Sequence, residues 1–317
     1  MNDSLYPLTF YPVYRDYVWG GRKLADVYGR EIPGEPTAES WELSDRMDGM
    51  SVIAHGSLEG TTLRSLIESR GEELLGTPAP ETFPLLVKIL DAKTSLSVQV
   101  HPNDATAAAF GGEAKTEMWY VLDADPGARV YCGLKPGSTE ATLREALEKD
   151  HLEKCLETIE VAKGDVIFVP GGCVHAIAAG CLLLEVQQNS NTTYRLYDWG
   201  RIGHDGKPRD LHVARAIQVI DWDPGNHGKM ETREIKPGHT QLLRTPYFSL
   251  ERIAIHQAHD LPTNGTWQII FVESGSIRIA DKLDLAAGQT CLLPACMTSC
   301  TLESRSGSTT QLIRIGP

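Results

Sequence analysis

The stretch VAKGDVIFVPGGCVHAI, residues Val161–Ile177, decides how this chain folds. Its apolar run Val166–Val169 has the composition of a buried strand, and Pro170-Gly171-Gly172 predicts a tight corner directly after it. His175 would begin the strand that comes back from that corner. A turn of this kind aims one imidazole into a pocket, so further polar side chains are expected on neighbouring strands.

Two upstream segments supply such side chains. Gln99 and His101 are two residues apart, as are Lys115 and Glu117. In a strand a spacing of two places both members of a pair on the same face. Gln, His, Glu and His can therefore converge from three strands. Two imidazoles, one carboxylate and one amide oxygen form a mixed nitrogen and oxygen set that suits a divalent metal, zinc first, with iron or manganese as alternatives.

Bulk composition restricts the classes of function. The chain has 317 residues, 41% of them hydrophobic and 23% charged, which is typical of an ordinary globular protein with two domains, or with one barrel and insertions. The formal charge of −12 argues against nucleic acid or an anionic membrane as a partner, because both require a basic surface. A small anionic substrate stays open if a few Lys and Arg are concentrated in the pocket.

The compartment is predicted from the N-terminus and the cysteines. Neither a basic leader nor a long apolar span is found, which favours a cytoplasmic protein. Seven scattered cysteines without a Cys-x-x-Cys pair are typical of reduced, mostly buried thiols. A monomer or a small homo-oligomer is expected, since an isologous interface has no short-range sequence signature.

The remaining chain is predicted to alternate strands with short helices. Strands are expected at 83–90 and from Leu96 onward, and amphipathic helices at 61–75 and 211–219. Another helix is expected up to about residue 150, with Ser138 as its N-cap.

The C-terminal segment 226–317 repeats an earlier pattern. Leu285–Gly288, five residues and Pro294 follow the spacing of Val161–Gly164, five residues and Pro170. This register aligns Ser299 with His175, and the similar strands 268–272 and 117–121 align Gln268 with Glu117. We therefore expect a catalytic metal-binding domain with helical insertions at 1–225, and a second barrel without metal ligands at 226–317.

The spacing of Gly164, Pro170, Gly172 and His175 resembles the second conserved motif of the cupin superfamily. The resemblance implies a mainly β fold with two cupin-type (jelly-roll) barrels and a few short inserted helices. In that family the motif His is a metal ligand. This chain departs from the pattern at Gln99, where a His is expected, and at Ala179, where many members carry Asn.

Five segments together are similar to type I mannose-6-phosphate isomerases in their short bacterial form. They are AESWELS (38–44), FPLLVKILDAKTSLSVQVHPND (83–104), KTEMWYVL (115–122), VPGGCVHAI (169–177) and QQNSNTTYRLYDWGR (187–201). The resemblance implies a single zinc ion per chain, held by Gln99, His101, Glu117 and His175. It also implies Arg195 as the active-site arginine, with Lys115 and Ser97 in the pocket.

Two positions depart from the family pattern. Thr116 stands where longer members have Pro, and Asn191 stands where an Asp is usual. Asn can keep the hydrogen bonds of Asp but cannot take a proton. The departure therefore removes a titratable group from position 191.

The implied reaction interconverts mannose 6-phosphate and fructose 6-phosphate through an enediolate. Negative charge develops on O1 and O2, where a divalent cation and charged donors such as Lys115 or Arg195 can stabilise it. Because the sequence has no Gly-rich phosphate loop, the phosphate is expected to bind side chains, with Ser97, Lys115 and Arg195 as candidates.

Two alternatives remain open at the level of sequence. Two His and one carboxylate also describe the iron site of cupin oxygenases, in which Lys115 and Arg195 would be dispensable. A sugar-phosphate-binding cupin without catalytic activity would bind the ligand without turnover, and Asn191 is the feature that favours it.

Overall fold

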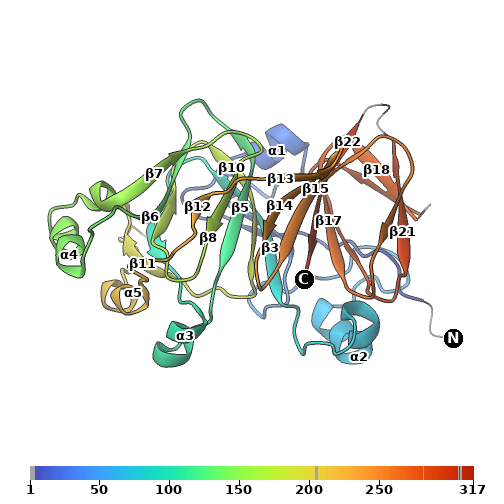
Figure 1. Cartoon of the computed structure of the whole chain (residues 1–317), viewed down its shortest axis with the longest axis horizontal. Helices are drawn as coiled ribbons and strands as arrows, with labels where there is room; N and C mark the ends of the chain where they lie inside the picture. The colour runs from blue at the N-terminus through green and yellow to red at the C-terminus, as the bar shows by residue number, and fades with distance from the viewer. Residues whose placement is uncertain (1–3, 204–205, 281, 306, 308) are drawn as a thin grey trace. The chain divides into compact units, whose positions relative to one another are not determined.

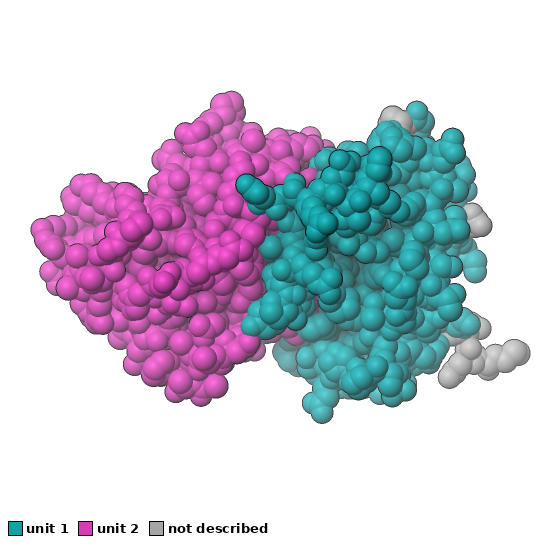
Figure 2. Space-filling view, in the orientation of Figure 1, with its two compact units in different colours: residues 1–13, 42–84, 231–317 teal, residues 14–41, 85–230 magenta. Residues whose placement is uncertain are grey.

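The computed structural model describes residues 4–203, 206–280, 282–305, 307 and 309–317. Strands predominate and the helices are few and short (Figure 1), which confirms the predicted mainly β class. The contacts divide the chain into two compact units (Figure 2). Unit 1 contains residues 1–13, 42–84 and 231–317, and unit 2 contains residues 14–41 and 85–230.

Two sheets form most of unit 2. The first sheet has the order β1-β2-β3-β10-β5-β8-β12 and the second has the order β11-β4-β9-β6-β7. The strands of the first sheet are β1 (Val13–Arg15), β2 (Glu39–Leu43), β3 (Leu85–Ala92), β10 (Cys181–Gln188), β5 (Glu117–Ala124), β8 (Val166–Val169) and β12 (Gly228–Lys229). Those of the second are β11 (Tyr194–Tyr197), β4 (Val98–Val100), β9 (His175–Ile177), β6 (Arg129–Leu134) and β7 (Leu156–Glu160).

The core of unit 2 takes side chains from both sheets. Trp119 and Leu183 from the first sheet form one buried cluster with Val130 and Ile177 from the second. Strand β3 is buried along its whole length, as its continuous apolar run in the sequence indicates. It begins two residues later than the predicted strand 83–90, directly after Pro84, which has no N–H to donate to a sheet.

Short helices connect the strands. They are α1 (Lys23–Tyr28), α2 (Leu63–Leu75), α3 (Asp104–Phe110), α4 (Glu140–Glu148) and α5 (Val213–Val219), together with the 3-10 turn η1 (Leu152–Cys155). The predicted N-cap Ser138 is wrong by one residue. Thr139 caps α4, because its hydroxyl accepts from the backbone of Thr142 and the Thr142 hydroxyl returns the contact. Within the described residues, no helix combines the length and the apolar character needed to cross a membrane.

Unit 1 contains a second pair of sheets. The larger has the order β13-β14-β15-β22-β17-β20 and the smaller has the order β16-β21-β18-β19. Their strands are β13 (Arg233–Lys236), β14 (His239–Arg244), β15 (Ser249–Ile255), β22 (Thr310–Gly316), β17 (Gln268–Ser274), β20 (Thr290–Leu293), β16 (His259–Pro262), β21 (Ser299–Ser304), β18 (Ser276–Ile279) and β19 (Leu283–Ala286). An apolar cluster drawn from both sheets, including Ile270, Val272, Ile277 and Leu302, forms the core.

The division into units differs from the predicted cut between residues 225 and 226. Residues 1–13 and 42–84 group with the C-terminal barrel. Leu8 pairs with Leu292 through two backbone hydrogen bonds of 2.9 and 2.8 Å, and the ring of Phe83 lies 4.8 Å from that of Trp267. These contacts join positions that are far apart in the sequence, so no local sequence pattern indicates them.

Candidate metal centre and adjoining pocket

The Pro-Gly-Gly corner connects the two sheets of unit 2. Strand β8 lies in the first sheet, whereas β9 pairs with β4 and β6 in the second, so the expectation that the strand of His175 comes back as a hairpin is wrong. The Gly172 N–H donates to the carbonyl of His101 at 2.7 Å. A Cβ on Gly171 would lie 2.7 Å from the Pro102 carbonyl oxygen. Glycine therefore allows the corner to pack directly on the segment that carries His101.

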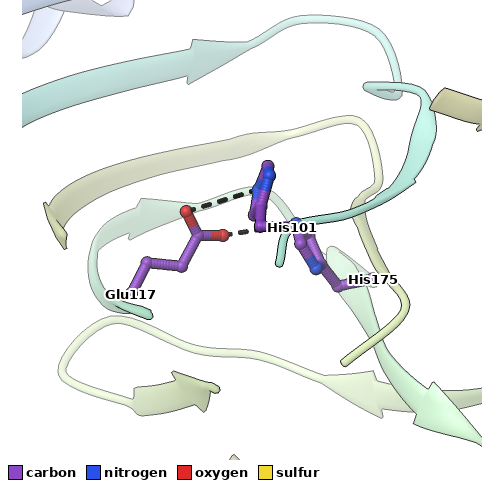
Figure 3. A group of neighbouring side chains, drawn as sticks. All are labelled: His101, Glu117 and His175. Carbon is purple, nitrogen blue, oxygen red and sulfur yellow. Dashed lines mark ion pairs between the residues drawn. The ribbon is translucent and has the colours of Figure 1, made fainter. Parts of the chain in front are cut away.

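Three predicted ligands meet in the interior of this barrel (Figure 3). His101 directly follows β4, Glu117 begins β5 and His175 begins β9. One ligand atom from each lies within 4.8 Å of the others, and all three residues are buried. His175 Nε2 is 3.3 Å from Glu117 Oε1, and His101 Nε2 is 3.7 Å from Glu117 Oε2. The spacing of two along separate strands thus brings these side chains together as the sequence predicted.

Both imidazoles are held in the state that binds metals. Nδ1 of His101 lies 2.7 Å from the Thr192 carbonyl oxygen, and Nδ1 of His175 lies 2.9 Å from that of Cys173. Since a carbonyl only accepts, each Nδ1 carries the proton and each Nε2 presents a lone pair. Burial lowers the pKa of His175 to about 4 and that of His101 well below its usual value. Both rings are therefore neutral at pH 7.

The carboxylate of Glu117 also fits a cation site. Burial raises the pKa of Glu117 to about 7, although Lys115 opposes the shift. Lys115 Nζ lies 2.5 Å from Oε2 and 3.1 Å from His101 Nε2. Oε1 of Glu117 has no hydrogen-bond donor among the described residues, whereas Oε2 contacts the Lys115 ammonium. A buried carboxylate oxygen without a donor is uncommon, and a bound divalent cation would satisfy it.

Gln99 stands beside the three ligands. It pairs with His175 across β4 and β9, and its Nε2 lies 3.3 Å from His175 Nε2. Rotation of the amide by half a turn exchanges its nitrogen and oxygen. The side chain is therefore placed where an amide oxygen can join the donor set of the imidazoles and the carboxylate.

A polar pocket adjoins this centre, and the other predicted residues lie in its wall. Ser97, Lys115 and Arg195 all line it. Arg195 Nε donates to the Ser97 hydroxyl at 3.2 Å, and its Nη1 donates to the Asp210 carbonyl at 2.8 Å. Asn191 lines the same pocket, so the departure from the family pattern is a change in the pocket wall.

A buried charged cluster in the pocket wall was not predicted in full. Lys88 Nζ lies 3.2 Å from Glu185 Oε2 and 3.5 Å from Glu39 Oε2. The indole N–H groups of Trp119 and Trp41 donate to Glu185 and Glu39 at 3.1 and 2.6 Å. Burial opposes ionisation of Glu185, but Lys115 and Lys88 lower its pKa to about 2. A lone Lys within LLVKIL and a lone Glu within LLLEV are charges in apolar strands, and such charges mark a buried cluster of this kind.

Comparisons with known proteins agree with this geometry. Residues 8–128 match the family model of the phosphomannose isomerase type I catalytic domain. The chain is 36% identical to the probable mannose-6-phosphate isomerase GmuF of Bacillus subtilis, over 94% of this chain and 96% of the relative. It is 38% identical to the mannose-6-phosphate isomerase ManA of the same organism, over 86% of this chain and 87% of the relative.

A solved structure extends the likeness to the fold. The crystal structure of a mannose 6-phosphate isomerase from Bacillus subtilis superimposes with a TM-score of 0.89 at 34% identity, covering 98% of this chain and 99% of the other. This match confirms the predicted cupin-type fold. By sequence and by structure, the chain belongs to the type I phosphomannose isomerase family.

Proposed function

We propose that this chain interconverts mannose 6-phosphate and fructose 6-phosphate in the pocket beside His101, Glu117 and His175. One observation carries the proposal: a buried set of two neutral imidazoles and a carboxylate adjoins a pocket lined by Ser97, Lys115 and Arg195. Family membership supports it, since the relatives GmuF and ManA are named as mannose-6-phosphate isomerases.

Zinc is the proposed metal, held by Gln99, His101, Glu117 and His175. Neutral imidazoles with a carboxylate suit zinc, and iron or manganese would accept the same donors. The bound cation supplies Lewis acidity that stabilises negative charge on the oxygens of the open-chain sugar. The carbonyls of Thr192 and Cys173 fix the orientation of the two rings, and Nε2 of each ring lies on the side of Glu117.

Lys115 is proposed to stabilise the negative charge that develops on the oxygens at the reacting end of the sugar. A base takes the proton from C2 of the open-chain aldose, and a proton is returned at C1. In the enediolate between these two steps, negative charge spreads to O1 and O2 of the sugar. The ammonium of Lys115 is held between Glu117 Oε2 and His101 Nε2, next to the proposed ligands. One preorganised charged donor aimed at developing charge lowers a barrier by about 3 kcal/mol.

Arg195 and Ser97 are proposed to bind the phosphate. The guanidinium is fixed by Ser97 and by the Asp210 carbonyl, so little rotamer entropy remains to be lost when an anion binds. A charge-assisted hydrogen bond from Arg to phosphate is about twice as strong as a neutral one. The substrate would thus have its phosphate at Arg195 and its carbonyl end near Lys115.

A cytoplasmic location is proposed with this function. All seven cysteines are free thiols, and five of them are buried. Free thiols are the usual state in a reducing compartment.

The test is isomerisation of mannose 6-phosphate by metal-stripped protein, before and after addition of zinc, iron or manganese, with His175→Ala as the comparison. We expect turnover that returns with zinc and is lost in the variant. Zinc bound in stoichiometric amount without turnover would support the sugar-phosphate-binding alternative, which Asn191 in the pocket wall favours. Turnover that survives complete metal removal would contradict the proposal.

A further inference from the structure

We propose that Arg209 supplies a second guanidinium to the phosphate of the substrate, beside Arg195, and so determines the preference for phosphorylated sugars. The proposal rests on the function proposed above and identifies a residue for which neither the sequence motifs nor the metal centre provides a role.

The position of Arg209 is the first observation. It lines the same pocket as Ser97, Lys115 and Arg195. Its side chain is 23% exposed, so the guanidinium borders the pocket and still reaches solvent. A phosphate on a substrate that enters this pocket would therefore pass this side chain.

The second observation is that Asp198 fixes the guanidinium of Arg209. Arg209 Nε donates to Asp198 Oδ2 at 2.8 Å, and Nη2 donates to Oδ1 at 2.5 Å. This bidentate contact uses two of the three nitrogens and leaves Nη1 to another acceptor. In Arg195 the contacts with Ser97 and Asp210 use Nε and Nη1, and leave Nη2. Each anchored guanidinium thus retains one donor nitrogen for a tetrahedral anion.

Charge balance is the third observation. The pKa of Arg195 is lowered first by burial and next by the positive charge of Arg209. The charged groups around Arg195 are the guanidiniums of Arg209 and Arg201 and the carboxylates of Asp198 and Asp210, so with Arg195 included the arginines outnumber the carboxylates by one. Lys115 already faces Glu117. The local excess of positive charge, in a chain whose formal charge is −12, is what a phosphate close to the dianionic state would neutralise.

The test compares Arg209→Gln and Arg209→Lys with the wild-type holoenzyme. Arg278→Gln is the matched control, because Arg278 makes the same kind of bidentate contact, with Asp284, in unit 1.

The readouts are KM and kcat for mannose 6-phosphate, and the inhibition constant of inorganic phosphate. For Arg209→Gln we expect KM and the inhibition constant to rise together by about 10-fold to 100-fold while kcat changes less than about threefold. Arg209→Lys keeps the charge without the fork and should lie between, and Arg278→Gln should match wild type.

A purely structural role for Arg209 predicts a different result. Loss of the Asp198 anchor alone would lower kcat or the thermal midpoint and leave the inhibition constant of phosphate unchanged, which would overturn the proposal. Unchanged KM in an active Arg209→Gln enzyme would also overturn it. If the wild-type holoenzyme failed to isomerise mannose 6-phosphate, the proposed function would fall, and calorimetric titration of inorganic phosphate into wild type and Arg209→Gln would still decide whether Arg209 binds the anion.

Discussion

The two barrels of this chain share an order of strands but differ in chemistry. In unit 2 the order β3-β10-β5-β8 recurs in unit 1 as β15-β22-β17-β20, and β4-β9-β6-β7 recurs as β16-β21-β18-β19. Over the residues that the structure describes, the His and Glu cluster capable of holding a metal lies in unit 2. The fold therefore does not require the site, and the site depends on a few positions within it.

Strand register identifies those positions. Glu117 pairs with Val169 directly before Pro170, and Gln268 pairs with Leu293 directly before Pro294. In the same way, Gln99 pairs with His175 in unit 2, and at the equivalent place in unit 1 Pro262 pairs with Ser299. In unit 1 the Gln268 amide donates to the Pro262 carbonyl at 2.9 Å. A neutral amide, hydrogen-bonded within unit 1, therefore stands at the position that corresponds to the Glu117 carboxylate of unit 2. We infer from this register that the second barrel is a copy with a structural role.

The comparison is tested most strongly by substituting equivalent positions. Glu117→Gln should reduce the isomerase activity by about 1,000-fold or more, because it removes a charged ligand of the proposed metal. Gln268→Ala and Ser299→Ala should leave kcat and bound metal at the wild-type level. Steady-state kinetics with metal analysis of each purified variant would decide this, and a comparable loss of activity in Gln268→Ala would disprove a purely structural second barrel.

A second prediction concerns an ion pair that recurs with reversed charge. Lys88 faces Glu185 across β3 and β10, whereas Glu251 faces Arg314 at the equivalent place across β15 and β22. Lys88→Met removes the ammonium that both Glu185 and Glu39 contact in the buried cluster, and should reduce the free energy of unfolding by about 3 to 5 kcal/mol. Arg314→Met should cost about 1 kcal/mol or less, because the pair is partly exposed and Glu251 keeps His239 at 2.8 Å.

Urea unfolding of the two variants and the wild type measures this difference. Equal destabilisation by both substitutions would contradict the prediction, because it would show that the buried pair and the partly exposed pair contribute equally to stability.

The smallest predicted effect is a pH dependence that arises in unit 2. Burial raises the pKa of Asp91 from 3.8 to about 6, while the equivalent residue of β15 is Ala254. Because folding favours the protonated form, the contribution of Asp91 is complete below pH 4 and is lost as the pH rises through 6. The stability of wild type relative to Asp91→Asn should fall by about 2 kcal/mol between pH 4 and pH 7. Unfolding free energies of both proteins at these pH values would measure it, and a constant difference would contradict the assignment.

The sequence predicted the parts of the site that depend on local spacing. The separation of two between Gln99 and His101, and the Pro-Gly-Gly corner before His175, determine which side chains face inward, and the structure brings His101, Glu117 and His175 together. The mainly β class was implied by the cupin resemblance, which rests on the spacing of Gly164, Pro170, Gly172 and His175. These features need no knowledge of which strands are neighbours.

The features that were missed depend on distant pairing. The cluster of Lys88 with Glu39 and Glu185 forms because β3 lies between β2 and β10, which the sequence does not indicate. Arg209 reaches the pocket through its contact with Asp198 rather than through a strand pattern. The grouping of residues 1–13 with unit 1 depends on pairs such as Leu8 with Leu292, which lie near opposite ends of the chain.

The pairing of Leu8 with Leu292 affects the order in which the two units can fold during synthesis. All residues of unit 2 have been added to the chain once residue 230 is made, whereas unit 1 needs strands that end at residue 316. All of unit 2 is therefore synthesised before unit 1 is complete. The segments 1–13 and 42–84 cannot pack against residues 231–317 until those residues have been made. Late, long-range strand pairing is slow and leaves apolar edges exposed in the meantime. Truncation near the C-terminus should for this reason harm residues 42–84, which were synthesised long before, more than the barrel that carries the site.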